Sequence, residues 1–134
     1  MLDSVIGALN THLNLRLAEQ NLISSNIANA DTPGYHAKEI EFESALREAL
    51  AVDDQLQMQA QDPRHTVIRE TDPIYPEIYE PETGVMRLDG NTVDRAGEMA
   101  KMASNQILYD ASIELMKRKL GMLKYAITEG GGNR

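Results

Sequence analysis

Apolar side chains recur at alternating steps of three and four residues along the C-terminal part of the chain. The repeating positions are Met99, Met102, Gln106, Tyr109, Ile113, Met116, Leu120, Leu123 and Ile127. This is the heptad spacing of a coiled-coil helix, and it predicts a single helix over residues 94–128. Mostly polar and charged residues stand between the repeating positions, so we expect the opposite face of this helix to be solvated.

The length of this predicted helix requires a partner. At ~1.5 Å per residue, about 35 helical residues span roughly 50 Å. A compact globule of this chain length would be only about 36 Å across. The helix therefore needs a neighbour of comparable length, from the same chain or from another.

A second run with the same spacing covers residues 2–29. Its apolar positions are Ile6, Leu9, Leu13, Ile23 and Ile27. Arg16 and Gln20 interrupt the apolar pattern in the middle, where they face either Gln106 or carboxylates of another chain. The two runs predict a mainly α-helical protein whose long N- and C-terminal helices pair as an antiparallel coiled coil.

The first helix is expected to end abruptly. Asn29 is typical of a helix C-terminus, because asparagine tolerates the left-handed backbone conformation. Pro33 biases Thr32 away from the helical region. Pro33 and Gly34 fit the two central positions of a type II turn.

The residues of this turn resemble a known family. The stretch from Ser25 to Tyr35 is similar to the N-terminal signature of the flagellar rod and hook axial proteins. The residues that carry this signature are Asn26, Asn29, Asp31, Thr32, Pro33, Gly34 and Tyr35. The following stretch 36–46, the later stretch 89–94 and the short chain narrow the resemblance to the subunits of the proximal rod.

The resemblance implies a structural subunit of the bacterial flagellar basal body, part of the periplasmic drive shaft used in motility. It implies delivery by the flagellar type III export system. The implied partners are further copies, other rod subunits, the rod–ring junction protein, the membrane ring and the export gate. It also suggests that Phe42 and Leu46 form an export-gate motif, although both residues equally suit a plain packing role.

The middle of the chain is expected to be small and irregular. Residues 39–50 carry an amphipathic stripe and predict a short helix. A β-hairpin is expected between residues 66–69 and 85–88, around a mobile acidic loop at 70–82. Asn91 or Asp94 is expected to cap the last helix. The predicted organisation is therefore a terminal-helix domain (1–30 and 91–128), a middle segment (31–90) and a flexible tail (129–134).

Composition argues against several classes of function. The chain of 134 residues has a net charge of −8, which disfavours nucleic-acid binding. It has no cysteine and no apolar run long enough to span a membrane. Residues 1–10 carry no lysine or arginine, so we do not expect them to act as a secretory signal. The histidines at 12, 36 and 65 are far apart and form no ligand set. We expect no enzyme activity, cofactor, metal, small-molecule substrate or nucleic-acid partner.

Two hypotheses follow for the apolar faces that a helix pair cannot bury by itself. The first is polymerisation into a tubular rod through contacts that do not close, with terminal helices that are partly disordered before assembly. The second is a soluble coiled-coil adaptor or export chaperone that binds a partner helix. The residues proposed for the assembly interface are the heptad positions given above, without Gln106.

Overall fold

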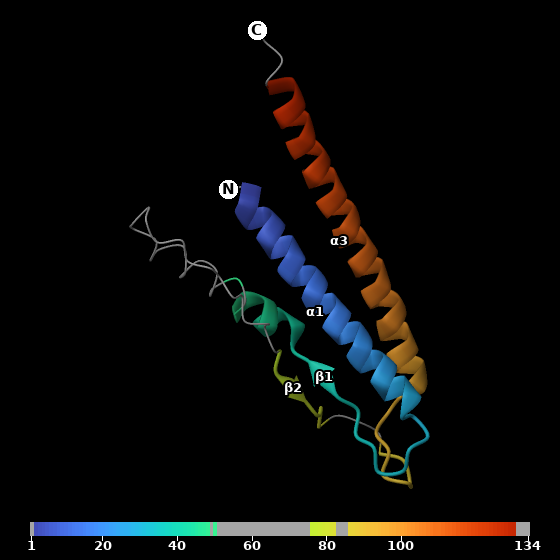
Figure 1. The fold of residues 1–134 in the computed structure, drawn as a ribbon. Helices are drawn as coiled ribbons and strands as arrows, with labels where there is room; N and C mark the ends of the chain where they lie inside the picture. The colour runs from blue at the N-terminus through green and yellow to red at the C-terminus, as the bar shows by residue number, and fades with distance from the viewer. Residues whose placement is uncertain (1, 49, 51–75, 83–85, 131–134) are drawn as a thin grey trace.

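Two long helices packed side by side dominate the structure. The computed structural model describes residues 2–48, 50, 76–82 and 86–130. Helix α1 spans Leu2–Ala28 and helix α3 spans Arg95–Gly130. The two helices run in opposite directions, so the start of α1 and the end of α3 point toward the same end of the molecule (Figure 1). The prediction of a mainly α-helical protein with an antiparallel terminal pair is confirmed.

Helix α3 is longer than its partner. It has 36 residues against 27 in α1, a difference of about 14 Å at the helical rise. Its C-terminal end extends past the start of α1 (Figure 1). The predicted tail at 129–134 was wrong in part, because Glu129 and Gly130 still belong to the helix; residues 131–134 lie outside the described part.

Helix α1 ends where the sequence predicts, but the backbone conformation and hydrogen bonds at its end differ from those expected. Asn29 does not adopt the left-handed conformation, since no described residue other than glycine has a positive φ. Its amide instead donates to the Ser25 carbonyl at 2.9 Å, and the Asn29 backbone N–H binds the same oxygen at 3.1 Å. The Ser25 carbonyl thus accepts two hydrogen bonds from one residue, which fixes Asn29 directly after the last helical turn.

Helix α3 begins after Asp94. The Asp94 carbonyl accepts the first helical hydrogen bond from the Glu98 N–H at 2.8 Å. This contact places Asp94 at the N-cap position, one of the two alternatives expected. Gly97 permits this arrangement, because a Cβ there would lie 2.7 Å from an Asp94 carboxylate oxygen.

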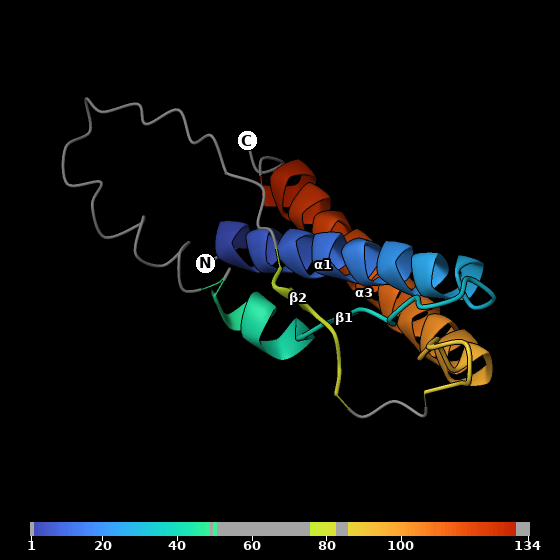
Figure 2. The ribbon, with the colours of Figure 1, turned by 90° about the horizontal axis from the view of Figure 1, so that it is seen from below.

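The middle segment folds against α1, on the side away from most of α3 (Figures 1 and 2). Strand β1, Glu39–Ile40, pairs antiparallel with strand β2, Ile78–Tyr79. Residues 42–48 form a short helix. The expected helix start at 39 was wrong, because the backbone at 39–40 is used in strand pairing.

The predicted hairpin is not the one observed. Residues 66–69 and Val85 lie outside the described part of the chain, and 86–88 are not in a strand. The partner of β1 comes from the stretch at 70–82 that was expected to be a loop. Each strand has only two residues, which is too short to show the alternation of apolar and polar residues by which strands are recognised in a sequence.

Candidate assembly interface

The helix-ending signature forms a buried junction with the segment that leads into α3. Asn26 is fully buried and uses its whole amide. Its Nδ2 donates to the Lys38 carbonyl at 2.8 Å and to the Glu98 carboxylate at 2.9 Å. Its Oδ1 accepts from the Lys38 N–H at 3.0 Å and from the Tyr35 hydroxyl at 3.1 Å. One asparagine therefore joins α1, the returning chain and α3.

The turn after α1 has the predicted geometry. The Tyr35 N–H donates to the Thr32 carbonyl at 3.3 Å, and Gly34 has a φ of 69°. A positive φ at the third turn residue is the mark of a type II turn. Gly90 also has a positive φ, of 78°, and a Cβ there would lie 3.5 Å from the Gly34 Cα. The two glycine turns pack against each other.

Asn91 holds this turn from the other side. It is fully buried, and its Nδ2 donates to the Asn29 carbonyl at 2.9 Å and the Thr32 carbonyl at 2.8 Å. Its Oδ1 accepts from the Val93 N–H at 2.7 Å. The sequence analysis assigned Asn91 no role beyond a possible helix cap. Its position in the stretch matching the family was the only available signal.

Charged side chains close the junction at the surface. Arg87 donates to the Ala30 carbonyl at 3.0 Å, and Arg95 forms an ion pair with Asp31. Ala30, Ala37 and Val93 form the small apolar cluster beneath. The turn-signature residues thus lie together: Asn26 is buried, Asn29 and Tyr35 are half-buried, and those at 31–34 are exposed.

A polar seam joins α1 to α3. We use this name for Glu98, Asn105, Ser112 and Lys119, which recur every seven residues and are buried or half-buried. The Asn105 Nδ2 donates to the Arg16 carbonyl and the Gln20 Oε1, both at 2.9 Å. The Ser112 hydroxyl lies 3.0 Å from His12 Nδ1. Alternating with this seam, Met102, Tyr109, Met116 and Leu123 are half-buried.

The heptad register expected for this helix pair was therefore wrong at alternate positions. Arg16 and Gln20 face Asn105, whereas the sequence suggested Gln106 or another chain. The physical reason is hydrogen bonding: the polar groups of α1 must be satisfied, and apolar residues facing them would leave them without partners. Gln106 is exposed and donates to Asp110 on its own helix at 3.1 Å.

Two apolar flanks remain beside the seam. The first flank contains Met99, Ile113, Leu120 and Ile127; Met99 is 59% exposed, Leu120 48% and Ile127 75%, whereas Ile113 is half-buried. The second flank contains Leu108, Leu115 and Met122, all exposed and spaced by seven residues. The sequence interpretation missed the second flank, although its seven-residue spacing could have revealed it.

The predicted interface residues of α1 are more covered than those of α3. Ile23 is 4% exposed, and the other four, Ile6, Leu9, Leu13 and Ile27, are half-buried. A groove of about 540 Å³ lies between the helices near the start of α1. Its lining is Val5, Ala8, Leu9, His12, Ser112 and Leu115. The groove therefore brings one residue of the second flank, Leu115, next to α1.

Phe42 packs on the polar centre of α1. The Arg16 guanidinium lies 3.7 Å from the centroid of its ring, and the His12 ring meets it edge-on at 5.2 Å. Leu46, one turn later on the short helix, is half-buried. The packing role of Phe42 is therefore observed, and its role in export stays a prediction.

Two titratable groups are perturbed around these contacts. Burial and the nearby Arg16 charge lower the pKa of His12, partly opposed by Glu19. At Lys101, partial burial lowers the pKa, but hydrogen bonds to Glu39 and Glu98 prevail and raise it above its ordinary value. Lys101 links β1 to Glu98, an acid that is only 4% exposed.

The described residues offer little for metal chemistry. No group of three or more histidine and carboxylate side chains among them is placed to hold a metal ion. His12 and His36 belong to different contacts: His36 lies 3.3 Å from Glu80, and His65 is outside the described part. Within that part, no helix combines the length and apolarity needed to cross a membrane.

Comparison with known proteins agrees with this geometry. Residues 6–36, which include the whole turn signature, match the family model described as flagella basal body rod protein. The flagellar basal body rod protein FlgB of Bacillus subtilis is 37% identical over 112 residues, 84% of each chain. The chain belongs to the FlgB family of flagellar basal body rod proteins.

Other FlgB proteins match over more of the chain. The Aeromonas hydrophila protein is 35% identical and covers 91% of this chain and 92% of its own. The Escherichia coli protein is 33% identical, with 92% and 95% covered. Membership in the FlgB family makes the chain a structural subunit of the flagellar basal body rod. The family is one of structural proteins and not of enzymes.

Proposed function

We propose that this rod subunit polymerises through the apolar flanks of α3, together with the interface residues of α1. The observation that carries the proposal is the distribution of polarity on α3. The face that meets α1 contains the polar seam, while Met99, Leu120 and Ile127 on the first flank are exposed. Exposed apolar surface of this extent is typical of an interaction site.

The exposed flanks support an open polymer and not a closed pair. They run along α3, whose C-terminal end extends beyond α1. The surface that the helix pair offers to a neighbour therefore changes along the length of α3. Contacts between unlike surfaces continue from copy to copy and generate a filament. In this assembly the terminal helices, 1–30 and 91–128, form the inner layer of the tube, and the segment 31–90 faces outward or bridges to neighbouring subunits.

The remaining parts of the proposal concern delivery and neighbours. The subunit is carried by the flagellar type III export system, with Phe42 and Leu46 read by the export gate. Its neighbours are further copies, other rod subunits, the rod–ring junction protein and the membrane ring. The relatives' name, flagellar basal body rod protein, supports a place in the rod.

Replacement of Leu120 by aspartate tests the proposal. Leu120 is 48% exposed in the single molecule, so Leu120→Asp should leave the purified chain folded, as judged by circular dichroism. A charge buried without a partner costs several kcal/mol, so the same change should prevent rod assembly and abolish swimming. The matched control is Ala103→Asp, because Ala103 is exposed and shares its outer helix position with Asp110.

The two variants give opposite results if the flank is an interface. Swimming should persist with Ala103→Asp and be lost with Leu120→Asp, while both proteins are produced at equal levels. Normal swimming with Leu120→Asp would refute a role for the first flank in assembly.

A further inference from the structure

Charge is distributed unevenly over the described chain. The distal part of α3, residues 112–129, contains four basic residues and two acidic ones. The basic residues are Lys117, Arg118, Lys119 and Lys124. Two described stretches of the middle segment, residues 39–48 and 76–82, together contain seven glutamates and a single basic residue, Arg47. The two regions therefore have opposite net charge.

Both charged surfaces are accessible. Lys117 and Lys124 are exposed on the distal end of α3, and Glu77, Glu80 and Glu82 are exposed around β2. Among the described residues, the ion pair made by the distal part of α3 is Arg118 with Glu114, 3.4 Å apart on the same helix. The charges of Lys117 and Lys124 are thus not neutralised by the described part of the molecule.

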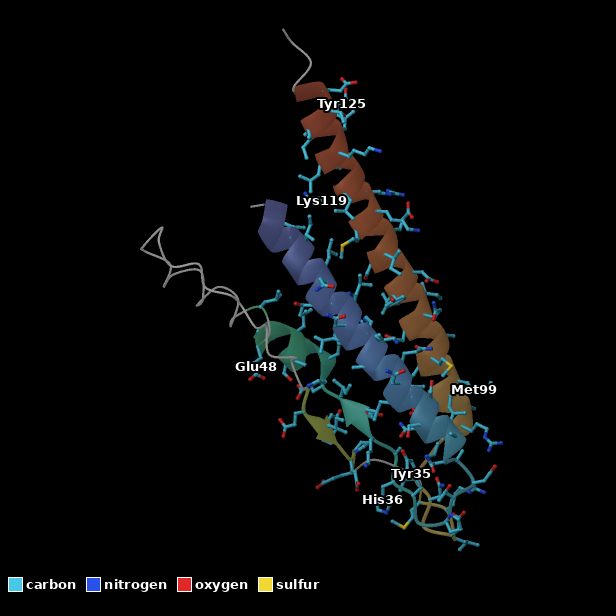
Figure 3. The ribbon with its side chains drawn as sticks, viewed as in Figure 1. Tyr35, His36, Glu48, Met99, Lys119 and Tyr125 are labelled. Carbon is cyan, nitrogen blue, oxygen red and sulfur yellow. The ribbon has the colours of Figure 1, made fainter. Side chains whose placement is uncertain are left out.

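The fold prevents the two surfaces from meeting within one molecule. Helix α1 lies between α3 and the short helix of the middle segment, as two perpendicular views show (Figures 1 and 2). Tyr125 marks the end of α3 that projects past α1, whereas Glu48 lies on the other side of α1 (Figure 3). Opposite charges on separate surfaces of one chain suit a contact between two copies.

We propose that the basic distal end of α3 docks on the acidic middle segment of the next copy of this chain. The proposal rests on the assembly function above and specifies one of its contacts. Because the two surfaces differ, the contact is heterologous and leaves one of each free at the ends of a row, as an open polymer requires. Complementary charge also selects the correct neighbour and orientation during assembly.

Charge exchange tests the contact in cells that lack the natural gene. The first variant combines Lys117→Glu with Lys124→Glu, and the second combines Glu77→Lys with Glu80→Lys. Each should abolish swimming, because like charges then face each other across the contact. The variant that combines all four changes restores opposite charges and should swim again. Lys117→Arg with Lys124→Arg keeps the charge at the same positions and should behave as the natural chain.

Disulfide trapping provides a direct measure of proximity. The chain has no cysteine, so Lys124→Cys combined with Glu80→Cys introduces the only two thiols. Oxidation of isolated basal bodies should give a ladder of linked copies that collapses on reduction. The two variants with a single cysteine serve as controls. Each lacks one thiol of the contact, so neither should give a ladder.

The outcomes separate this contact from the assembly function itself. Normal swimming of both charge-reversed variants, or absence of the ladder in assembled rods, would overturn the contact and leave rod assembly standing. Loss of swimming with Lys117→Glu and Lys124→Glu that the four-fold variant does not restore would also overturn docking on a second copy. Failure of the natural chain to restore rods to the deletion strain would instead overturn the proposed function.

Discussion

Asn26 should be the most sensitive side chain of the junction. Asn26→Ala removes four hydrogen bonds from a fully buried position, three to neutral groups and one to the Glu98 carboxylate. A neutral bond contributes about 1 kcal/mol and one to a charged group about 1.5–3 kcal/mol, so the gross loss is about 5 kcal/mol. Alanine recovers roughly 0.6 kcal/mol through its better helix propensity.

The expected net loss is therefore about 4 kcal/mol. Small proteins unfold in urea with a slope of about 1–3 kcal/mol per molar, so the midpoint should fall by roughly 2 M. Urea titration of the purified chain, followed by circular dichroism, measures this shift. A total stability of about 5–15 kcal/mol is usual, so this loss removes between roughly a quarter and four-fifths of the stability of the chain.

Asn29→Ala is the matched control, because the same residue type lies one turn later in the signature. The Asn29 side chain donates to the Ser25 carbonyl and accepts from the Thr32 hydroxyl, both at exposed positions. Water replaces such partners, so the loss should be about 1 kcal/mol. Equal midpoints for the two variants would refute the reasoning that burial makes Asn26 the centre of the junction.

Two further predictions concern the contacts of Phe42. The lowered pKa of His12 means that the unfolded chain binds this proton more tightly, so the unfolding free energy should rise with pH up to the ordinary histidine pKa of about 6.5 and level off above it. The slope should shrink in His12→Gln, and an unchanged slope would exclude His12 as its source. Phe42→Ala should reduce secretion of the chain if the export gate reads this residue. Arg16→Gln, which removes the cation above the Phe42 ring together with its bonds to Glu19 and Asn105, should not. Equal secretion defects in both variants would point to packing.

The sequence predicted the two helices well because each carries a sustained heptad pattern and a clear boundary. The turn at Pro33 and Gly34 was predictable for the same reason: proline and glycine each permit a narrow range of backbone conformations. The register of α1 against α3 was not predictable from apolar spacing. Helix α3 carries several columns with a seven-residue repeat, and the column buried against α1 contains Asn105 and Ser112.

The junction and the sheet were hidden for a different reason. Asn26 and Asn91 are polar residues that a pattern assigns to the surface, yet both are fully buried. Their burial depends on backbone groups 12 and 62 residues away, such as those of Lys38 and Asn29. Non-local hydrogen bonds of this kind leave no periodic signal, and the pairing of β1 with β2 is another example.

On α3, polar residues of the seam face α1 while apolar residues of the flanks are exposed, and this arrangement connects folding to assembly. Buried polar pairs add little stability relative to apolar pairs of similar size, although loss of one partner is costly. They fix one register, as polar residues at coiled-coil core positions do. Three such pairs lie at different points along the α1–α3 pair: Asn26 with Glu98, Asn105 with Gln20 and Ser112 with His12. A slip of one helix past the other would break all three together. The α1–α3 pair is thereby aligned without use of the apolar flanks, which stay available for neighbouring subunits. An apolar seam would give a more stable single molecule, but it would leave less surface to stabilise the rod.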